Sequence, residues 1–259
     1  MGDWALILGA SSGFGEATAL ALANAGWDIF GVHFDRRQTM PNVERIVGQI
    51  RETGRQAHFF NVNAADAEKR AETLNEIERL RKSGHVQVLM HSLAFGALKP
   101  VVADDPKEAL TKAQIEMTLD VMANSLIYWT QDVVQRKLMV EGGRIFAMTS
   151  SGGTRAIAAY GAVSGAKACL EAYIRQLALE LAPRGITANA IRAGVTVTPS
   201  SRVIPGSEEL YQMAAQRNPN GRLTTPQDVA STIALLSRPE SYWTSGNVIG
   251  VDGGEDIAG

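Results

Sequence analysis

Short apolar runs alternate with longer segments in which apolar positions recur every three or four residues. The short runs are rich in β-branched and aromatic side chains, as expected for the buried strands of a parallel sheet. Strands are predicted at residues 4–8, 29–32, 57–60, 86–90, 144–148, 187–191 and 248–251. Helices are predicted at residues 14–25, 42–53, 65–82, 106–139, 157–181, 208–217 and 226–236.

This alternation predicts right-handed βαβ crossovers and an α/β fold with a doubly wound parallel sheet of about seven strands and helices on both faces. Neither a linker nor an internal repeat interrupts residues 1–259, so we expect one domain. Residues 196–225 form a long excursion between a strand and the last helix, which is typical of a substrate lid. Leu210, Tyr211 and Met213 either line this lid or pack it onto the body.

Composition narrows the choice of partners and compartment. The 259 residues carry a net charge of −2, so the composition does not indicate a basic surface for binding nucleic acid or a membrane. One cysteine excludes an internal disulfide framework, and the four histidines lack metal-ligand spacing. The chain shows no signal peptide or membrane span, so a soluble, cytoplasmic protein without a metal is expected.

A glycine-rich turn follows the first predicted strand. Gly9, Gly13 and Gly15 stand in G-A-S-S-G-F-G, at the point where the first helix opens. Glycines there allow a tight turn and the close approach of a pyrophosphate to the helix N-terminus, where free N–H groups and the helix dipole favour an anion. The turn therefore predicts a bound dinucleotide.

The end of the second strand bears on the choice of dinucleotide. A carboxylate there holds a ribose 2′-hydroxyl, whereas an arginine accommodates a 2′-phosphate. His33 stands at the selecting position, Asp35 comes too late for the ribose contact, and Arg36 and Arg37 can reach a phosphate. NADPH is thus favoured over NADH, although a solvated loop would carry the same arginines.

The stretch from Ser150 to Lys167 carries the candidate chemistry. Tyr160 and Lys167 lie seven residues apart in a predicted helix, nearly two turns, so both side chains can face one cleft. A lysine there is expected to lower the pKa of the phenol and make it a usable acid. An ordinary amphipathic helix with a solvated lysine would show the same spacing.

Four motifs together resemble the short-chain dehydrogenase/reductase family along the whole chain. They are the glycine turn, Asn61-Val62, the serine/tyrosine/lysine stretch and V-D-G-G at residues 251–254. The resemblance implies a single Rossmann domain, hydride transfer with a nicotinamide cofactor, and a homotetramer.

The tyrosine stands at an unusual position for this family. The usual pattern places it four residues before the lysine, where this chain has Val163; here Tyr160 stands seven before Lys167. This spacing, together with M-H-S-L-A-F-G-A-L-K-P at residues 90–100, resembles the enoyl-acyl carrier protein reductases of bacterial fatty-acid synthesis. The three-glycine turn and Ser150 are similar to the third, NADPH-preferring type.

This resemblance implies reduction of trans-2-enoyl thioesters carried by acyl carrier protein or CoA. The implied catalytic residues are Tyr160, Lys167 and Ser150, with Tyr160 on the thioester oxygen and Lys167 on the nicotinamide ribose. The implied cofactor-binding residues are Gly9, Ser11, Ser12, Gly13, Phe14, Gly15, His33, Arg36, Arg37, Asn61, Val62, Ser92, Leu93, Ala94, Lys167, Gly194, Thr196 and Thr198. The implied substrate-binding residues are Phe95, Met122, Tyr160 and Tyr211.

Several alternatives stay open at this point. Ser150 also fits a loop cap, Phe95 also fits the core, and His91 is expected to be a packed or cofactor-flanking residue. Met122 stands where many family members have an asparagine that anchors a proton-relay water, and Asn124 is two positions away around the helix. Arg202, Arg217 and Arg222 near the lid are candidates for steering an acidic carrier protein. Competing functions are reduction of an enoyl-CoA, dienoyl-CoA or ketoacyl substrate, and non-catalytic sensing of NADP(H).

Overall fold

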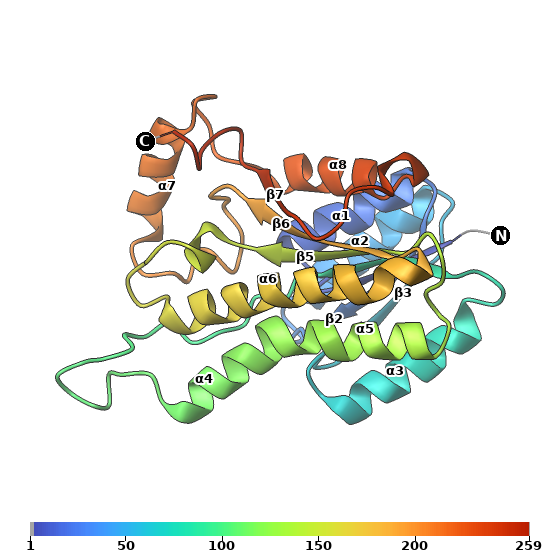
Figure 1. Cartoon of the computed structure of the whole chain (residues 1–259), viewed down its shortest axis with the longest axis horizontal. Coiled ribbons are helices and arrows are strands. Elements are labelled where there is room, and N and C mark those ends of the chain that lie inside the picture. Colours follow the sequence, from blue (N-terminus) through green and yellow to red (C-terminus); the bar gives the residue numbers. More distant parts are fainter. Residues whose placement is uncertain (1–2, 259) are drawn as a thin grey trace.

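The computed structural model describes residues 3–258. Its strands form one parallel sheet in the order β3-β2-β1-β4-β5-β6-β7 (Figure 1). The strands are β1 (Trp4–Leu8), β2 (Asp28–His33), β3 (Ala57–Asn61), β4 (Val86–His91), β5 (Arg144–Thr149), β6 (Thr187–Ala193) and β7 (Val248–Val251). The strand order reverses between β1 and β4, so the predicted doubly wound sheet is confirmed.

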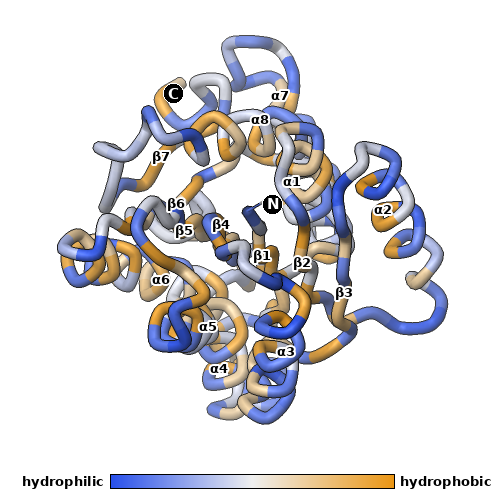
Figure 2. Tube along the Cα trace, turned by 90° about the vertical axis from the view of Figure 1, so that its right-hand side faces the viewer, coloured by the Kyte–Doolittle hydropathy of each residue, from blue (hydrophilic) through white to orange (hydrophobic). Residues whose placement is uncertain are grey.

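Helices cover both faces of the sheet (Figures 1 and 2). One face packs against α1 (Gly13–Asn24), α2 (Met40–Glu52) and α8 (Pro226–Leu236). The other packs against α3 (Ala67–Leu80), α4 (Lys112–Leu119), α5 (Ser125–Gln135) and α6 (Gly161–Leu181). The remaining helix, α7 (Ser207–Arg217), lies at the end of the molecule where the loops after the strands gather.

The central strand shows why the apolar runs are continuous. Trp4, Leu6 and Leu8 point into the layer under α3, α5 and α6, whereas Ala5 and Ile7 point into the layer under α1, α2 and α8. Every residue of β1 is buried, because both faces of the sheet are covered.

The predicted helix at residues 106–139 was wrong in its extent. Thr111 caps α4 through a capping box with Gln114, so the preceding residues lie outside the helix. A π-helical turn at Asp120–Asn124 joins α4 to α5. The helix ends at Gln135, because Lys137 adopts a left-handed φ of 55°. Apolar periodicity continues across such interruptions and therefore does not reveal them.

The predicted lid, residues 196–225, holds α7 between irregular segments. A lid function for it stays a prediction. None of the helices within residues 3–258 is long and apolar enough to span a membrane.

The left-handed conformation of Lys137 at the end of α5 can be tested by substitution. The N–H of Lys137 donates to the carbonyl of Val134 at 3.1 Å, and the N–H of Leu138 donates to that of Val133 at 2.9 Å, the hydrogen bonds of a Schellman motif. Its left-handed position normally holds glycine. We expect Lys137→Gly to raise the free energy of unfolding by about 0.5–1 kcal/mol. Lys137→Ala is the control, since alanine keeps the steric cost; chemical denaturation in which both variants behave alike would contradict this assignment.

Candidate active site

The carboxyl ends of the strands meet the glycine turn at one end of the sheet. Gly9 has a φ of +92°, and a Cβ there would lie 2.4 Å from the carbonyl oxygen of Ser92. A Cβ on Gly15 would lie 2.0 Å from the carbonyl oxygen of Gly9. Both positions therefore exclude a side chain, and the backbone of the turn stays open to an approaching ligand. With the N-terminus of α1 directly behind it, this turn fits a pyrophosphate.

Neighbouring elements hold the turn in place. The side-chain amide of Asn42, on α2, donates to the carbonyl of Ser11 at 2.8 Å. Thr198, after β6, also contacts the turn, with its methyl group 3.4 Å from the position of a Cβ on Gly13. Two of the predicted cofactor-binding segments therefore meet at this turn.

The loop after β2 lies closer to the glycine turn than its sequence spacing predicted. The carboxylate of Asp35 hydrogen-bonds the hydroxyls of Ser11 and Thr39 and lies 3.0 Å from Nδ1 of buried His33. These hydrogen bonds outweigh its partial burial and lower the pKa of Asp35. Asp35 therefore lies beside the glycine turn, because the chain folds back after His33. The expectation that Asp35 does not contact the ribose stays a prediction.

Asn61 fixes this folded-back loop. Its amide donates to the carbonyl of Asp35 and its side-chain oxygen accepts the N–H of Asp35, both at 2.9 Å. Arg36 and Arg37 are exposed, and neither guanidinium forms an ion pair within the part of the chain that the structure describes.

Tyr160 lies just outside the helix in which it was predicted. Ala159 adopts a left-handed φ of 59°, which no helical residue can have, so α6 begins at Gly161. The Tyr160 ring lies against Gly152, where a Cβ would come within 2.6 Å of Cε1. The phenol hydrogen-bonds the Ser150 hydroxyl, which also accepts the N–H of Gly152 at 3.1 Å. The structure thus brings together two of the three predicted catalytic side chains.

The electrostatics of the phenol differ from expectation. Burial raises the pKa of Tyr160, and the hydrogen bond from Ser150 opposes this only in part. The prediction that Lys167 lowers the pKa of the phenol was wrong, because the ammonium is directed elsewhere. Tyr160 is therefore protonated at neutral pH and can donate a hydrogen bond.

Lys167 is buried and directed toward β5. Its ammonium donates to the carbonyl of Met148 at 2.7 Å, and burial lowers the pKa of Lys167 to about 8. Glu171, one helical turn further along α6, opposes that shift by its charge. Glu171 in turn accepts the hydroxyl of Thr149 at 2.6 Å. Glu171 and Thr149 were missed from the sequence, although a carboxylate four residues after a lysine was a usable signal.

His91 is a packed residue, as expected. Its Nε2 lies 2.8 Å from the hydroxyl of Ser125, which donates to the carbonyl of Val121 in the π-helical turn. Burial, with a smaller effect of the Lys167 charge, lowers the pKa of His91 to about 3. The ring stays neutral at physiological pH and does not exchange protons there.

Apolar side chains surround position 163, where the family's usual pattern has its tyrosine. Val163 and Met122 are buried against Gly96, and a Cβ on Gly96 would lie 2.8 Å from Val163 and 2.9 Å from the Met122 sulfur. Met122 therefore lies in the core. Asn124 accepts the hydroxyl of Tyr173 at 3.0 Å and does not take over the place of the missing asparagine.

The other predicted residues lie around the same end of the sheet. Phe95, after β4, is 67% exposed. Tyr211 is buried on the lid, with its hydroxyl 2.7 Å from that of Ser201, and Thr196 donates to the carbonyl of Gly194 at 2.9 Å. Further predicted residues also follow the strands: Ser12, Val62, Leu93 and Ala94 lie outside helices and strands, and Phe14 lies in the first turn of α1.

Two of the three arginines suggested for steering a carrier protein are already paired. Arg217 binds Glu255 at 3.0 Å, and Arg222 binds Asp228 at 2.7 Å. The hydrogen bonds from Arg222 hold the pKa of Asp228 well below its usual range. Each of these two arginines thus binds a carboxylate close to the lid, and a role in steering a carrier protein stays a prediction.

Comparisons with known proteins agree with this geometry. Residues 9–255 match the family model described as Enoyl-(Acyl carrier protein) reductase. The NADH-named enoyl-[acyl-carrier-protein] reductase FabI of Nostoc sp. is 31% identical over 83% of this chain and 81% of its own. The 1-cyclohexenylcarbonyl-CoA reductase of Streptomyces collinus is 29% identical over 97% of this chain and 86% of its own. The crystal structure of the NADH enoyl-[acyl-carrier-protein] reductase from Aquifex aeolicus VF5 covers 100% of this chain and 98% of its own, with a TM-score of 0.86 and 23% identity.

The charge interaction between Glu171 and Lys167 predicts a pH response. We expect the Lys167 ammonium to lose its proton near pH 8, and Glu171→Gln to move this midpoint to lower pH, because the carboxylate charge favours the ammonium. Nζ chemical shifts, assigned with Lys167→Met, report the midpoint. Glu180→Gln, at an exposed position of α6, is the control. An unchanged midpoint in Glu171→Gln would show that the two charges do not interact.

Proposed function

Because the chain belongs to the short-chain dehydrogenase/reductase family, in the group described as enoyl-(acyl carrier protein) reductases, we propose that it reduces the 2,3 double bond of trans-2-enoyl thioesters with NADPH. The observation that carries this proposal is the place of the phenol. Tyr160 points to Ser150 from outside α6, while the position of the family's usual tyrosine is a buried valine.

A protonated phenol suits this reaction. When bound, a reduced nicotinamide supplies the hydride to the β-carbon of the substrate. This would leave an enolate, which takes up a proton from water at its α-carbon to complete the reduction. Negative charge develops on the thioester oxygen during hydride transfer, and a hydrogen bond donated by Tyr160 to that oxygen stabilises the transition state. A phenol with a raised pKa can do this without giving up its proton, whereas reduction of a ketone needs that proton on the oxygen. Ser150 orients the phenol, and Lys167 supplies a positive charge on the cofactor side.

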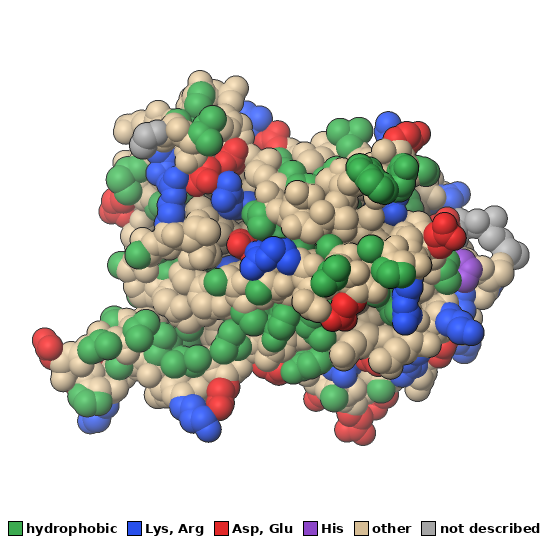
Figure 3. Space-filling model, viewed as in Figure 1, with side chains coloured by type: hydrophobic (Ala, Val, Ile, Leu, Met, Phe, Trp, Pro, Cys, Tyr) green, Lys and Arg blue, Asp and Glu red, His purple; other side chains and the backbone are tan. Residues whose placement is uncertain are grey.

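Exposed apolar side chains on the segment after β4 and on the proposed lid support an acyl substrate. The segment after β4 carries Phe95, Val101 and Val102, and Val101 lies against Gly161, directly after the tyrosine. Val197 and Val203 on the proposed lid are also exposed. Figure 3 shows hydrophobic side chains gathered on the segment that projects beside α4. These surfaces can receive a hydrocarbon chain at the site.

NADPH is proposed over NADH on the charges after β2. The carboxylate of Asp35 already has three hydrogen-bond partners, which leaves it less able to hold a ribose hydroxyl. The exposed guanidinium groups of Arg36 and Arg37 are available to a 2′-phosphate. A homotetramer and either acyl carrier protein or CoA as the carrier also belong to this proposal.

The reaction is tested with a panel of thioesters and the variant Tyr160→Phe. We expect NADPH oxidation with crotonyl-CoA or an enoyl-carrier thioester, and a loss of about 10²-fold in kcat for Tyr160→Phe, the effect of one oxyanion donor. Dinucleotide affinity should stay unchanged. Tyr242→Phe, at an exposed position, is the control. Turnover of a β-ketoacyl thioester alone would overturn the proposal, and nucleotide binding without any turnover would favour a sensor.

Cofactor choice is tested by replacing both arginines with alanine. The double variant Arg36→Ala/Arg37→Ala should raise the KM for NADPH by about tenfold or more, the loss expected for charge-assisted contacts with a phosphate, and change the KM for NADH little. Initial rates with each cofactor measure this. Equal effects on both cofactors would place the arginines away from the 2′-phosphate.

A further inference from the structure

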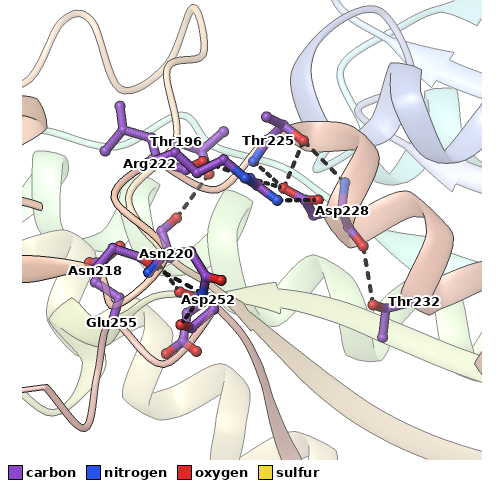
Figure 4. A network of polar contacts seen from close by, with 12 residues as sticks. Thr196, Asn218, Asn220, Arg222, Thr225, Asp228, Thr232, Asp252 and Glu255 are labelled. Atoms are coloured by element: carbon purple, nitrogen blue, oxygen red, sulfur yellow. Dashed lines mark hydrogen bonds and ion pairs between the residues drawn. The ribbon is translucent and has the colours of Figure 1, made fainter. Parts of the chain in front are cut away.

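The segment after β7 folds into a tight turn that contacts the lid. The carboxylate of Asp252 accepts the N–H groups of Gly254 at 3.0 Å and Asp256 at 3.2 Å. Two lid amides bind the carbonyls of this turn, Asn218 to Asp252 and Asn220 to Gly253, each at 2.8 Å (Figure 4). Residues 252–256 are therefore part of the surroundings of the site.

Glu255 joins two segments that carry predicted site residues. Its side chain is 5% exposed; Oε2 accepts the N–H of Val195 at 2.9 Å, and Oε1 accepts Arg217 at 3.0 Å. Val195 directly precedes Thr196, and Arg217 is the last residue of α7. A buried carboxylate is tolerated only with such partners, so Glu255 holds the loop after β6 against the lid helix.

Asp256, the next residue, joins another two segments. Its Oδ1 lies 2.9 Å from Arg155 and its Oδ2 lies 2.8 Å from Arg192, and Arg155 also donates to its backbone carbonyl at 2.7 Å. Arg155 lies between Ser150 and Tyr160, and Arg192 lies in β6. Asp256 thus holds the segment that carries the phenol against the strand that leads to Thr196.

We propose that Glu255 and Asp256 are positioning residues for the two halves of the site. Glu255 fixes the loop at residues 194–198 and the start of the lid for dinucleotide binding. Asp256 fixes residues 151–160, and with them the Tyr160 phenol, for the chemical step. Because the two carboxylates are adjacent, the two halves share one support. The role in the chemical step rests on the proposed reduction, whereas the role in dinucleotide binding does not.

Two isosteric variants distinguish the role in dinucleotide binding from the role in the chemical step. Glu255→Gln should weaken dinucleotide binding by about tenfold or more, as expected for a lost charge-assisted hydrogen bond, with a smaller effect on kcat. Asp256→Asn should lower kcat by about tenfold with dinucleotide affinity unchanged. Fluorescence titration of the bound reduced dinucleotide gives the affinity, and thioester turnover gives kcat. Glu240→Gln, an exposed carboxylate before β7, is the control.

Partner variants check that these carboxylates act through their arginines. Arg217→Met should reproduce Glu255→Gln, and Arg155→Met should reproduce Asp256→Asn, with no further loss in the corresponding double variants. Asp256→Glu keeps the charge and should recover part of kcat.

Hydrogen exchange gives a readout that does not depend on the substrate. Exchange should increase within residues 151–160 in Asp256→Asn and within residues 194–217 in Glu255→Gln. If both variants lose affinity, kcat and protection equally, the two carboxylates only stabilise the fold, and the proposal is overturned. No change in either variant would also overturn it. If the parent protein reduces no thioester, the proposed reaction fails, and affinity with hydrogen exchange still decides the positioning roles.

Discussion

The contact between the Tyr160 ring and the turn at residues 150–152 decides how the site is built. The Ser150 hydroxyl fixes the phenol, and Gly152 makes room for the ring. Ala159 holds the left-handed conformation that places the ring outside α6. Such strain persists only where the surroundings over-determine it. The phenol is thereby positioned by a loop after β5 and not by the helical register, which leaves position 163 free for a core valine.

Burial then sets the charges around that phenol. It raises the pKa of Tyr160, lowers the pKa of Lys167 to about 8 and lowers the pKa of His91 to about 3. The phenol and the imidazole are neutral at physiological pH, and the ammonium stays charged because Glu171 and the carbonyl of Met148 favour it. The charged groups around the phenol are therefore the Lys167 ammonium and the Glu171 carboxylate, while the phenol and the imidazole carry no charge.

The sequence predicts the sheet well, because a strand covered on both faces must be apolar at every position, as β1 is. It predicts the glycine turn because the close approach of Gly15 to Gly9 arises within one strand-turn-helix segment. It fails where one residue's backbone interrupts a periodic pattern, as at Ala159, Lys137 and the π-helical turn. The direction of the Lys167 side chain and the pairing of Arg217 with Glu255 depend on contacts between distant segments, which no spacing rule contains.

The distribution of ion pairs also shows how the site's two halves are connected. Arg192 and Val195 lie three residues apart at the end of β6, and each is bound by one of two consecutive carboxylates. The same two carboxylates also bind Arg155, in the segment before Tyr160, and Arg217, in the lid helix. Isolated surface ion pairs contribute little to stability, but a buried carboxylate that binds both a backbone N–H and an arginine strongly disfavours other geometries. The lid helix and the segment before Tyr160 are thus both anchored on the turn after β7, each through its own carboxylate.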